Sequence, residues 1–498
     1  MNKLIIYYMC LVVVLLTSCD LDINEDPNYA SSDDITAELI FPSVQSAIAA
    51  ANNDIMFNYA GFFAQYFDQM PEANQFNDLA ELSINESDAT IDRAYFDIYA
   101  AALQDIEDIK EKTTNTANLF AASVLRAYCF QLMVDNMDYT PYSDALNGTV
   151  EPTWDDGQSV YEGVLAEMDE AEANYNASTD EMTMTDMMFS QDMAQWVGYA
   201  NALRLRMYLR LYEVDNSVAD EITTLVSNNN FFTGDVELDI YSDDDENRSP
   251  FYSSYYDLGT ANHAAGYPIV SYMNYTNDPR IEYAMNPAAN TDEYVGQLCG
   301  SKTIMDSWAG DWDNDDVSNI NYDLYDGTGA TRPAYLFTQA ELQFLIAEVE
   351  YKFNGNATAA KTAYETAIES DFSTKGFSGS SDFIAQTSVS WDNASDKLEL
   401  IGMQKWVALF YIDNMEAWSE IRRTDYPATS EYSAKEVYDN PTQYTPGELV
   451  INYLSSLEDD NSLMKRMYYP ETARSLNSNT PDISYTYYGS DPVWWDVN

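Results

Sequence analysis

The sequence predicts a mainly α-helical fold in which antiparallel helix pairs form a rigid scaffold and irregular segments form one loop-rich face. Two observations support this prediction. Apolar residues recur at helical spacing along most of the chain. Glycine, proline, asparagine, aspartate and tyrosine replace that pattern over about 231–333, and the chain is again irregular over about 426–498. Because binding residues usually lie in loops carried by a rigid scaffold, we expect the loop-rich face to bind a ligand.

The N-terminus has the organisation of a signal peptide over residues 1–18. Its apolar run, from Leu4 to Leu16, is shorter than the roughly 20 residues that a membrane-spanning helix needs. No later stretch is long and apolar enough to be expected in a membrane. The segment ending in Cys19 resembles the bacterial lipobox, whose cysteine is acylated after cleavage. We therefore expect lipid on Cys19 to anchor the chain, since several acyl chains together attach a protein stably to a membrane. The alternative is an ordinary secretory signal with a cysteine beside its cleavage site.

Composition limits the organisation of the chain and its partners. Residues 19–34 begin acidic and lack apolar periodicity, so we expect a flexible tether, followed by a single helical domain over 35–498. The formal net charge is −60, from 83 acidic against 23 basic residues. That potential repels phosphate backbones and excludes nucleic acid as a partner. Arg204, Arg206 and Arg210 crowd one predicted helix in this cation-poor chain, so we expect them to pair with carboxylates.

Helical periodicity is clearest from about Leu119 to Asn136, where apolar residues repeat at i and i+4 in two adjacent stripes. Comparable stretches are predicted at about 88–111, 159–175, 194–214, 338–352, 358–370 and 397–423. Most form pairs, and the pair over 338–370 fits the tetratricopeptide pattern, in which aromatic and small residues interlock two antiparallel helices. The matching positions are Phe344, Ala347, Tyr351, Gly355, Ala360, Tyr364 and Ala367.

The residues that commonly carry catalysis argue against most enzyme classes. His263 is the only histidine, so a nucleophilic triad has one candidate base and a zinc site lacks nitrogen ligands. We expect His263 to be an ordinary surface or structural histidine. Glycosidases need only two facing carboxylates, and no spacing among the 83 acidic residues singles out such a pair. Cys129 lies on a strongly apolar stretch, so we expect a buried thiol there rather than a disulfide with Cys299.

No cofactor is expected, and calcium is the one candidate metal. Asp311, Asp313 and Asp315 have the alternating oxygen ligands that open a calcium loop. Asp316 occupies the position of the turn glycine, and Tyr322 that of the closing glutamate, so the segment does not match an EF-hand. A solvated acidic loop is the alternative interpretation.

Several motifs resemble the SusD/RagB family and occur in order over nearly the whole mature chain. They look most like the SusD-like branch of nutrient-binding outer-membrane lipoproteins. The motifs are Asn24-Glu25-Asp26-Pro27-Asn28, Arg126-Ala127-Tyr128, Asp138-Tyr139-Thr140-Pro141-Tyr142-Ser143-Asp144-Ala145, Asn201-Ala202-Leu203-Arg204-Leu205-Arg206, Gln404-Lys405-Trp406, Glu416-Ala417-Trp418, Ile421-Arg422-Arg423-Thr424, Arg466-Met467-Tyr468-Tyr469-Pro470 with Asn477, and Trp494-Trp495-Asp496.

This resemblance implies a tetratricopeptide-like helical scaffold with a loop-rich ligand-binding face, lipid-anchored on the outer surface of the outer membrane. It also implies a partner, a SusC-like TonB-dependent transporter, to which the protein delivers an oligosaccharide or another nutrient such as a peptide. Two alternatives stay open from the residues alone. One is a tetratricopeptide-like scaffold that binds protein partners on the outer membrane, and the other is a surface hydrolase that uses paired carboxylates.

Ligand-binding residues are expected among aromatics that lie beside amides and carboxylates in irregular segments, because sugars are held by stacking and by hydrogen bonds to their hydroxyls. The chain has 40 tyrosines, more than a core needs. Two stretches qualify, one from Gln65 to Asn77 and one from Tyr272 to Trp312. The candidates from these stretches are Tyr66, Gln69, Asn77, Tyr272, Trp308 and Trp312.

Overall fold

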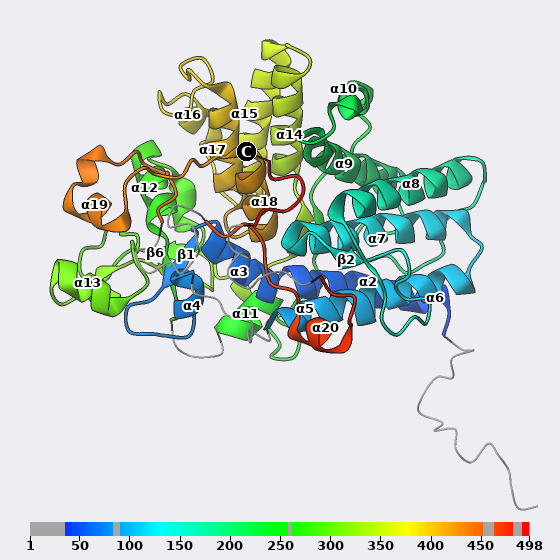
Figure 1. Cartoon of the computed structure of the whole chain (residues 1–498). Helices are drawn as coiled ribbons and strands as arrows, with labels where there is room; N and C mark the ends of the chain where they lie inside the picture. Colours follow the sequence, from blue (N-terminus) through cyan, green and yellow to red (C-terminus); the bar gives the residue numbers. More distant parts are fainter. Residues whose placement is uncertain (1–34, 83–89, 257–260, 452–462, 482–490, 498) are drawn as a thin grey trace, which may run out of the picture.

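The computed structural model describes residues 35–82, 90–256, 261–451, 463–481 and 491–497. The predicted signal peptide, Cys19 and the tether lie outside the described residues. In the part that is described, helices form most of the molecule, and two groups of them can be followed in Figure 1. Long helices fill the centre and the right side of that view, and short helices and strands gather at the left.

The longer helices account for the predicted scaffold, and neighbouring ones pack in pairs. α7 lies along α8, α14 along α15, and α17 against α18. In chain order these helices are α2 (Ala37–Asn52), α3 (Ile55–Phe63), α5 (Thr90–Phe96), the π-helical η2 (Asp97–Leu103), α6 (Gln104–Lys112), α7 (Thr116–Met137), α8 (Gly157–Asn176), α9 (Met193–Tyr212), α10 (Ala219–Asn228), α14 (Gln339–Lys352), α15 (Ala357–Thr374), α17 (Lys397–Leu409) and α18 (Asn414–Thr424). The sequence prediction covered most of them but not α2, α3 and α10.

Side-chain caps define where several of these helices begin. Asn115, Asp156, Thr338 and Asn356 each accept a hydrogen bond from a backbone N–H in the first turn of α7, α8, α14 and α15. Gly355, with a φ of 62°, makes the turn between α14 and α15. These local signals explain why the predicted starts of these helices agree closely with the observed ones.

The tetratricopeptide-like packing of α14 on α15 is confirmed. A separate hydrophobic core fills the space between these two helices and α17. It contains most of the residues that match the pattern, namely Phe344, Ala347, Ala360, Tyr364 and Ala367. Small residues facing aromatic ones allow the two helix axes to approach closely, which is why this part of the fold could be recognised from spacing.

The prediction of one continuous helix over 397–423 is wrong. The chain leaves helical conformation after Leu409, and Tyr411 has a positive φ of 59°. Asp413 then caps a second helix, α18, by accepting a hydrogen bond from the Glu416 N–H. The periodicity continued through the break because both helices bury apolar residues against the same body, and periodicity alone does not register a turn of a few residues.

By length and composition, one helix in the described part of the chain, α7, could span a membrane. The sequence prediction had expected no such stretch after the N-terminal apolar run. In the folded chain 89% of its apolar window is buried inside the protein. Its residues pack against α2, α6, α8 and α9, as the central helix of a globular body does.

The loop-rich segment 231–333 contains more regular structure than its composition predicted. It includes α11 (Pro250–Tyr255), α12 (Tyr267–Thr276), α13 (Lys302–Ala309), the 3-10 helices η4 (Pro279–Glu282), η5 (Asn314–Asp316) and η6 (Gly329–Thr331), and the strands β4 (Val236–Leu238), β5 (His263–Ala265), β6 (Met285–Asn286) and β7 (Asn319–Ile320). β1 (Phe67–Gln69) joins this segment to the N-terminal helices in a sheet of order β1-β5-β7-β6. Short paired strands escape prediction because their partners are distant in sequence.

The remaining elements are short and mostly lie around these two parts. They are α4 (Asn77–Ala80), α16 (Ser380–Ile384), α19 (Ala434–Asp439), α20 (Glu471–Leu476), the 3-10 helices η3 (Asn216–Val218) and η7 (Pro441–Gln443), and the strands β2 (Thr140–Pro141), β3 (Trp154–Asp155) and β8 (Ala334–Phe337). β2 pairs with β3 and β4 with β8, both antiparallel. In Figure 1, α4, α12, α13 and α19 gather at one end of the molecule.

Buried ion pairs hold the scaffold together, as predicted for the arginines of α9. Arg206 donates two hydrogen bonds, of 2.9 and 2.7 Å, to Glu341 on α14. Arg210 donates a 2.6 Å hydrogen bond to Asp135 on α7, and Arg204 pairs with carboxylates on α8. Because breaking such a pair strands a buried charge, these contacts couple the packing of α7, α9 and α14.

His263 is a structural residue and Cys129 is a buried thiol, as predicted. His263 is fully buried, with Nδ1 2.5 Å from the Tyr322 hydroxyl and Nε2 2.7 Å from Asn58 Oδ1. Burial lowers the pKa of His263 to about 3, so the ring is neutral at ordinary pH. Cys129 and Cys299 are both buried and form no disulfide.

Candidate ligand-binding site

β1 brings a carboxylate to the loop-rich end of the molecule. Side chains alternate along the strand, so Phe67 and Gln69 are buried while Asp68 between them is partly exposed on the opposite side. The backbone before β1 passes very close to Gly266, where a Cβ atom would lie 2.1 Å from the Gln65 carbonyl oxygen. Only glycine permits that approach, and the Gly266 N–H donates a 3.0 Å hydrogen bond to Tyr66 O.

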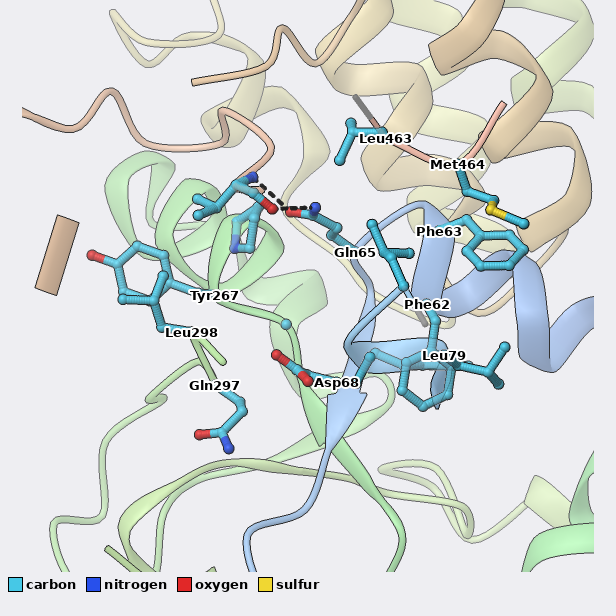
Figure 2. A pocket seen from close by; sticks show the side chains of 16 residues that line it. Phe62, Phe63, Gln65, Asp68, Leu79, Tyr267, Gln297, Leu298, Leu463 and Met464 are labelled. Carbon is cyan, nitrogen blue, oxygen red and sulfur yellow. Dashed lines mark hydrogen bonds between the residues drawn. The ribbon is translucent and has the colours of Figure 1, made fainter. Parts of the chain in front are cut away.

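A small cavity of about 40 Å³ opens beside Asp68. Figure 2 shows the Asp68 carboxylate among the labelled side chains, directed toward Gln297 and Leu298. The wall comes from four separate parts of the chain: the α3–β1–α4 region, the start of α12, the segment before α13, and the residues after α19. The lining residues are Phe62, Phe63, Gln65, Phe67, Asp68, Leu79, Ala80, Leu82, Gly266, Tyr267, Pro268, Gln297, Leu298, Val450, Leu463 and Met464.

Two amide side chains in the wall are held in fixed orientations. Gln65 Nε2 donates a 2.7 Å hydrogen bond to Val450 O, and Gln65 Oε1 accepts one of 2.8 Å from Val450 N. Gln297, 1% exposed, accepts a 3.0 Å hydrogen bond from the Trp312 indole N–H. Side chains that are already ordered bind a ligand without a further loss of conformational entropy.

The Asp68 carboxyl is the ionisable group of the cavity. Burial raises the pKa of Asp68 well above the usual range, and the nearby Glu81 carboxylate raises it further, against a lowering by the hydrogen bond from the Gln69 N–H. A carboxyl group that keeps its proton to higher pH can both donate and accept a hydrogen bond. Asp68 can therefore bind a hydroxyl in either role.

Aromatic side chains continue the wall outward from the cavity. Leu298 lines the cavity and packs in one cluster with Tyr267 and the Trp308 ring. The Trp308 ring centroid lies 5.7 Å from that of Tyr438 on α19. The cavity and these rings thus form one continuous surface, in which polar groups lie next to flat apolar faces.

The six ligand-binding candidates from the sequence all lie in or behind this region, but three are buried. Tyr66 and Gln69 are fully buried and Tyr272 is 6% exposed. The Tyr66 hydroxyl donates a 2.5 Å hydrogen bond to Trp406 O, and the Tyr272 hydroxyl accepts one of 3.1 Å from Gln404. These two rings pack on Trp406 and support the wall from behind.

The other three candidates are partly exposed. Asn77 begins α4, whose Leu79 and Ala80 line the cavity. Trp308 lies on α13, and Trp312 follows α13 and contacts the cavity through Gln297. The structure therefore brings Asn77, Trp308 and Trp312 to the same end of the molecule.

The structure adds Asp68, Tyr267 and Gln297 to the candidate site. Asp68 and Gln297 fall inside the two predicted stretches, but their composition alone did not distinguish them from their neighbours. The alternation of a strand at Phe67–Gln69 was the signal that favours Asp68 over Gln69, and a three-residue strand is too short to be read from the sequence. Tyr267 lies just before the second stretch, at the start of α12.

The calcium candidates adopt a local turn rather than a metal cage. Asp313 caps η5 by accepting a 2.9 Å hydrogen bond from the Asp315 N–H, and Asp311 is exposed. Among the residues that the structure describes, no group of three or more histidine, cysteine or acidic side chains is arranged to hold a metal ion. Calcium binding by Asp311, Asp313 and Asp315 stays a prediction.

Comparison with known proteins agrees with this architecture. A family model described as SusD-like, starch-binding and associating with the outer membrane, matches residues 27–444. None of the curated proteins matches the sequence. A solved SusD homologue from Bacteroides vulgatus is 20% identical, covers 93% of this chain and 98% of its own, and superposes with a TM-score of 0.71. A SusD homologue from Bacteroides uniformis is 19% identical, covers 92% of this chain and 99% of its own, and has a TM-score of 0.68.

A third solved structure, a chitin-binding SusD homologue from Flavobacterium johnsoniae, is 20% identical, covers 93% of this chain and 96% of its own, and has a TM-score of 0.67. At such identities the structural likeness concerns the fold, which is the helical scaffold with its loop-rich end. The family match extends over most of the sequence, from the segment just after the predicted tether cysteine to the region of α19. The chain therefore belongs to the SusD-like family.

Proposed function

We propose that the protein is a surface lipoprotein of the outer membrane that captures an oligosaccharide and delivers it to a SusC-like TonB-dependent transporter. One observation carries the ligand class. Fixed amides and a carboxyl group, from Gln65, Gln297 and Asp68, lie beside the aromatic faces of Tyr267 and Trp308. Sugars present the same combination, with hydroxyl groups around an apolar C–H face. The chitin-binding neighbour in the SusD-like fold supports the same ligand class.

The size of the cavity indicates how such a ligand binds. About 40 Å³ has room for a few water molecules or one ring substituent, and not for a sugar ring. The ring itself would lie across the mouth of the cavity and extend toward Trp308 and Trp312, which are partly exposed. One hydroxyl or its bridging water would reach Asp68. This mode of binding suits an extended glycan, which continues along the surface on both sides of the bound ring.

Retention by the full chain tests this proposal. The purified protein is incubated with a panel of glycans and peptides, and the bound and free fractions are analysed. Depletion of a glycan without new products supports capture. New shorter products would identify a hydrolase, retention of peptides alone would change the ligand class, and retention of neither would favour a scaffold for protein partners.

Substitution of the aromatic surface tests its location. Trp308→Ala and Trp312→Ala should each weaken glycan retention by up to about tenfold, since stacking of a ring on an aromatic side chain contributes about 0.5–1.5 kcal/mol. Tyr275→Ala is the matched control, because Tyr275 is 59% exposed on α12 but belongs neither to the cluster that joins Trp308 to Leu298 nor to the pair of Trp312 with Gln297. Unchanged retention by both tryptophan variants would refute this placement of the ligand.

The anchor and the transporter are tested in cells. Cys19→Ser should release the protein from the membrane fraction, because the thiol that accepts the lipid is lost. Affinity purification of the wild-type protein from detergent-solubilised outer membranes should recover a large TonB-dependent barrel. Membrane retention of the Cys19→Ser protein would contradict the lipid anchor, and purification without a barrel would contradict delivery to a transporter.

A further inference from the structure

A second and larger cavity, of about 230 Å³, lies in the helical scaffold between α14, α17 and α18. Its deep part is formed by Trp406, Leu409 and Ala417, each at most 2% exposed, and its mouth by the partly exposed Leu398, Gly402 and Tyr426. None of these residues belongs to the wall around Asp68. The two cavities are nevertheless neighbours, because the Tyr66 ring stacks on Trp406 with a centroid distance of 5.6 Å.

The charges of this cavity are balanced, unlike those of the whole chain. Three carboxylates and three cationic groups line it, although the chain carries 83 acidic and 23 basic residues. They alternate in space, so that each cation has a carboxylate within 4.0 Å. The six residues are Glu213, Glu348, Glu420, Lys352, Lys405 and Arg423. Neither an anion nor a cation finds a net opposite charge there, so the lining favours a ligand without net charge.

Several of these groups keep unused hydrogen-bonding capacity. Lys352 Nζ lies 3.6 Å from Glu213 Oε1 and 4.0 Å from Glu348 Oε1, both beyond hydrogen-bond distance. Lys405 is 4% exposed, and its ammonium makes no well-aligned hydrogen bond within the described part of the chain although Glu420 Oε2 is 2.9 Å away. Two ammonium donors and the Glu213 acceptor therefore remain available beside an apolar wall.

We propose that this cavity is a second binding site, which takes one neutral polyhydroxylated molecule of about the size of a single sugar unit. Hydroxyl groups donate to the Glu213 carboxylate and accept from the Lys352 and Lys405 ammonium groups, and the C–H face of the ring lies against Ile401 and Trp406. The volume is below the roughly 300 Å³ at which pockets for drug-sized ligands begin, so a single unit fits and an oligosaccharide does not. This site is independent of the capture of an oligosaccharide beside Asp68.

Ligand-observed NMR with free glucose and galactose tests the proposal on the full chain, with glycine as a zwitterionic probe and acetate as an anionic one. A ligand of this size should bind with a Kd on the order of a millimolar. Two variants at the partly exposed mouth alter the cavity without touching its buried base. Leu398→Trp fills the space, and Lys352→Met replaces the ammonium, which lies 5.3 Å from the centroid of the Tyr212 ring, by an unbranched apolar side chain.

Both variants should weaken monosaccharide binding by about tenfold or more, whereas Trp308→Ala should leave it unchanged. Thermal unfolding confirms that each variant is folded, and if Leu398→Trp is unfolded, Lys352→Met decides. Binding of glycine or acetate in place of the sugars, loss of sugar binding in Trp308→Ala, or wild-type binding by a folded Lys352→Met would each overturn the second site. No monosaccharide binding together with normal oligosaccharide retention would overturn this inference alone and leave the proposed function standing.

Discussion

Replacement of Asp413 by asparagine tests how burial sets the charge of the carboxylates between α9, α14 and α18. Asp413 is 3% exposed and caps α18 by accepting a 3.1 Å hydrogen bond from the Glu416 N–H. Burial raises the pKa of Asp413 from 3.8 to about 6; the Arg206 guanidinium lowers it and the Glu416 carboxylate raises it. Asparagine keeps the cap, because its side-chain oxygen accepts the same hydrogen bond, but it cannot ionise.

The pKa shift sets the sign and the size of the effect on stability. The folded state holds this proton at higher pH than the unfolded state, so the contribution of Asp413 to the free energy of unfolding falls as pH rises from about 4 to about 7. A shift of about two units at about 1.36 kcal/mol per unit corresponds to about 3 kcal/mol in full. About 2 kcal/mol of this contribution is lost between pH 4 and pH 8. The remainder is already lost at pH 4, because the Asp413 carboxyl of the unfolded chain is partly ionised at that pH.

The assay is urea unfolding followed by tryptophan fluorescence at about pH 4 and pH 8. The free energy of unfolding of Asp413→Asn, minus that of the wild type, should be about 2 kcal/mol larger at pH 8 than at pH 4. Asp192→Asn, at the exposed cap of α9, controls for the exchange of one capping residue for another. An equal difference between variant and wild type at both pH values would show that Asp413 does not carry its proton into the neutral range.

Three further outcomes follow from packing and burial. Arg206→Met should destabilise the fold by about 3–5 kcal/mol in urea unfolding, because it strands the buried Glu341 carboxylate, and replacement of Glu341 by leucine in the same protein should recover part of the loss. Additive losses in that double variant would contradict the pairing. Gly266→Ala should cost about 1–3 kcal/mol, since the new Cβ would lie 2.1 Å from a backbone oxygen beside β1; wild-type stability would refute the close approach. Cys129 and Cys299 should resist thiol reagents until urea unfolds the chain, because burial raises the pKa of both thiols, that of Cys299 to about 12. Rapid labelling of the native protein, located by peptide mapping, would show that these thiols are accessible.

Much of the scaffold could be predicted from the sequence because its determinants are local. Apolar stripes four residues apart predicted α7 and α9, and the caps Asn115 and Asp192 mark their starts. The interlocking of Phe344 with Tyr364 follows from residues that are 20 positions apart or fewer, within one helix pair. The arginines of α9 were expected to pair with carboxylates for a simple reason, since buried cations need partners.

The candidate site was predicted only to the level of a region. Composition placed it in the irregular segments, and Trp308 and Trp312 lie there with partly exposed rings. Tyr66 and Tyr272 come from the same segments but pack on Trp406, which is more than 130 positions away from either. An aromatic residue in a loop stacks on a ligand or on its own protein with similar chemistry, so residue type does not separate the two roles.

Contacts between distant parts of the chain decide whether a residue of the irregular segments faces the cavity or packs inside the protein. Gln65 is oriented by Val450, 385 residues later, and the cavity beside Asp68 exists because α4, α12, the segment before α13 and the residues after α19 meet there. No local pattern encodes such a meeting. Periodicity, caps and motifs therefore specified most of the scaffold helices and the family, whereas the choice of Asp68 over Gln69 depended on which face of a three-residue strand the folded core covers.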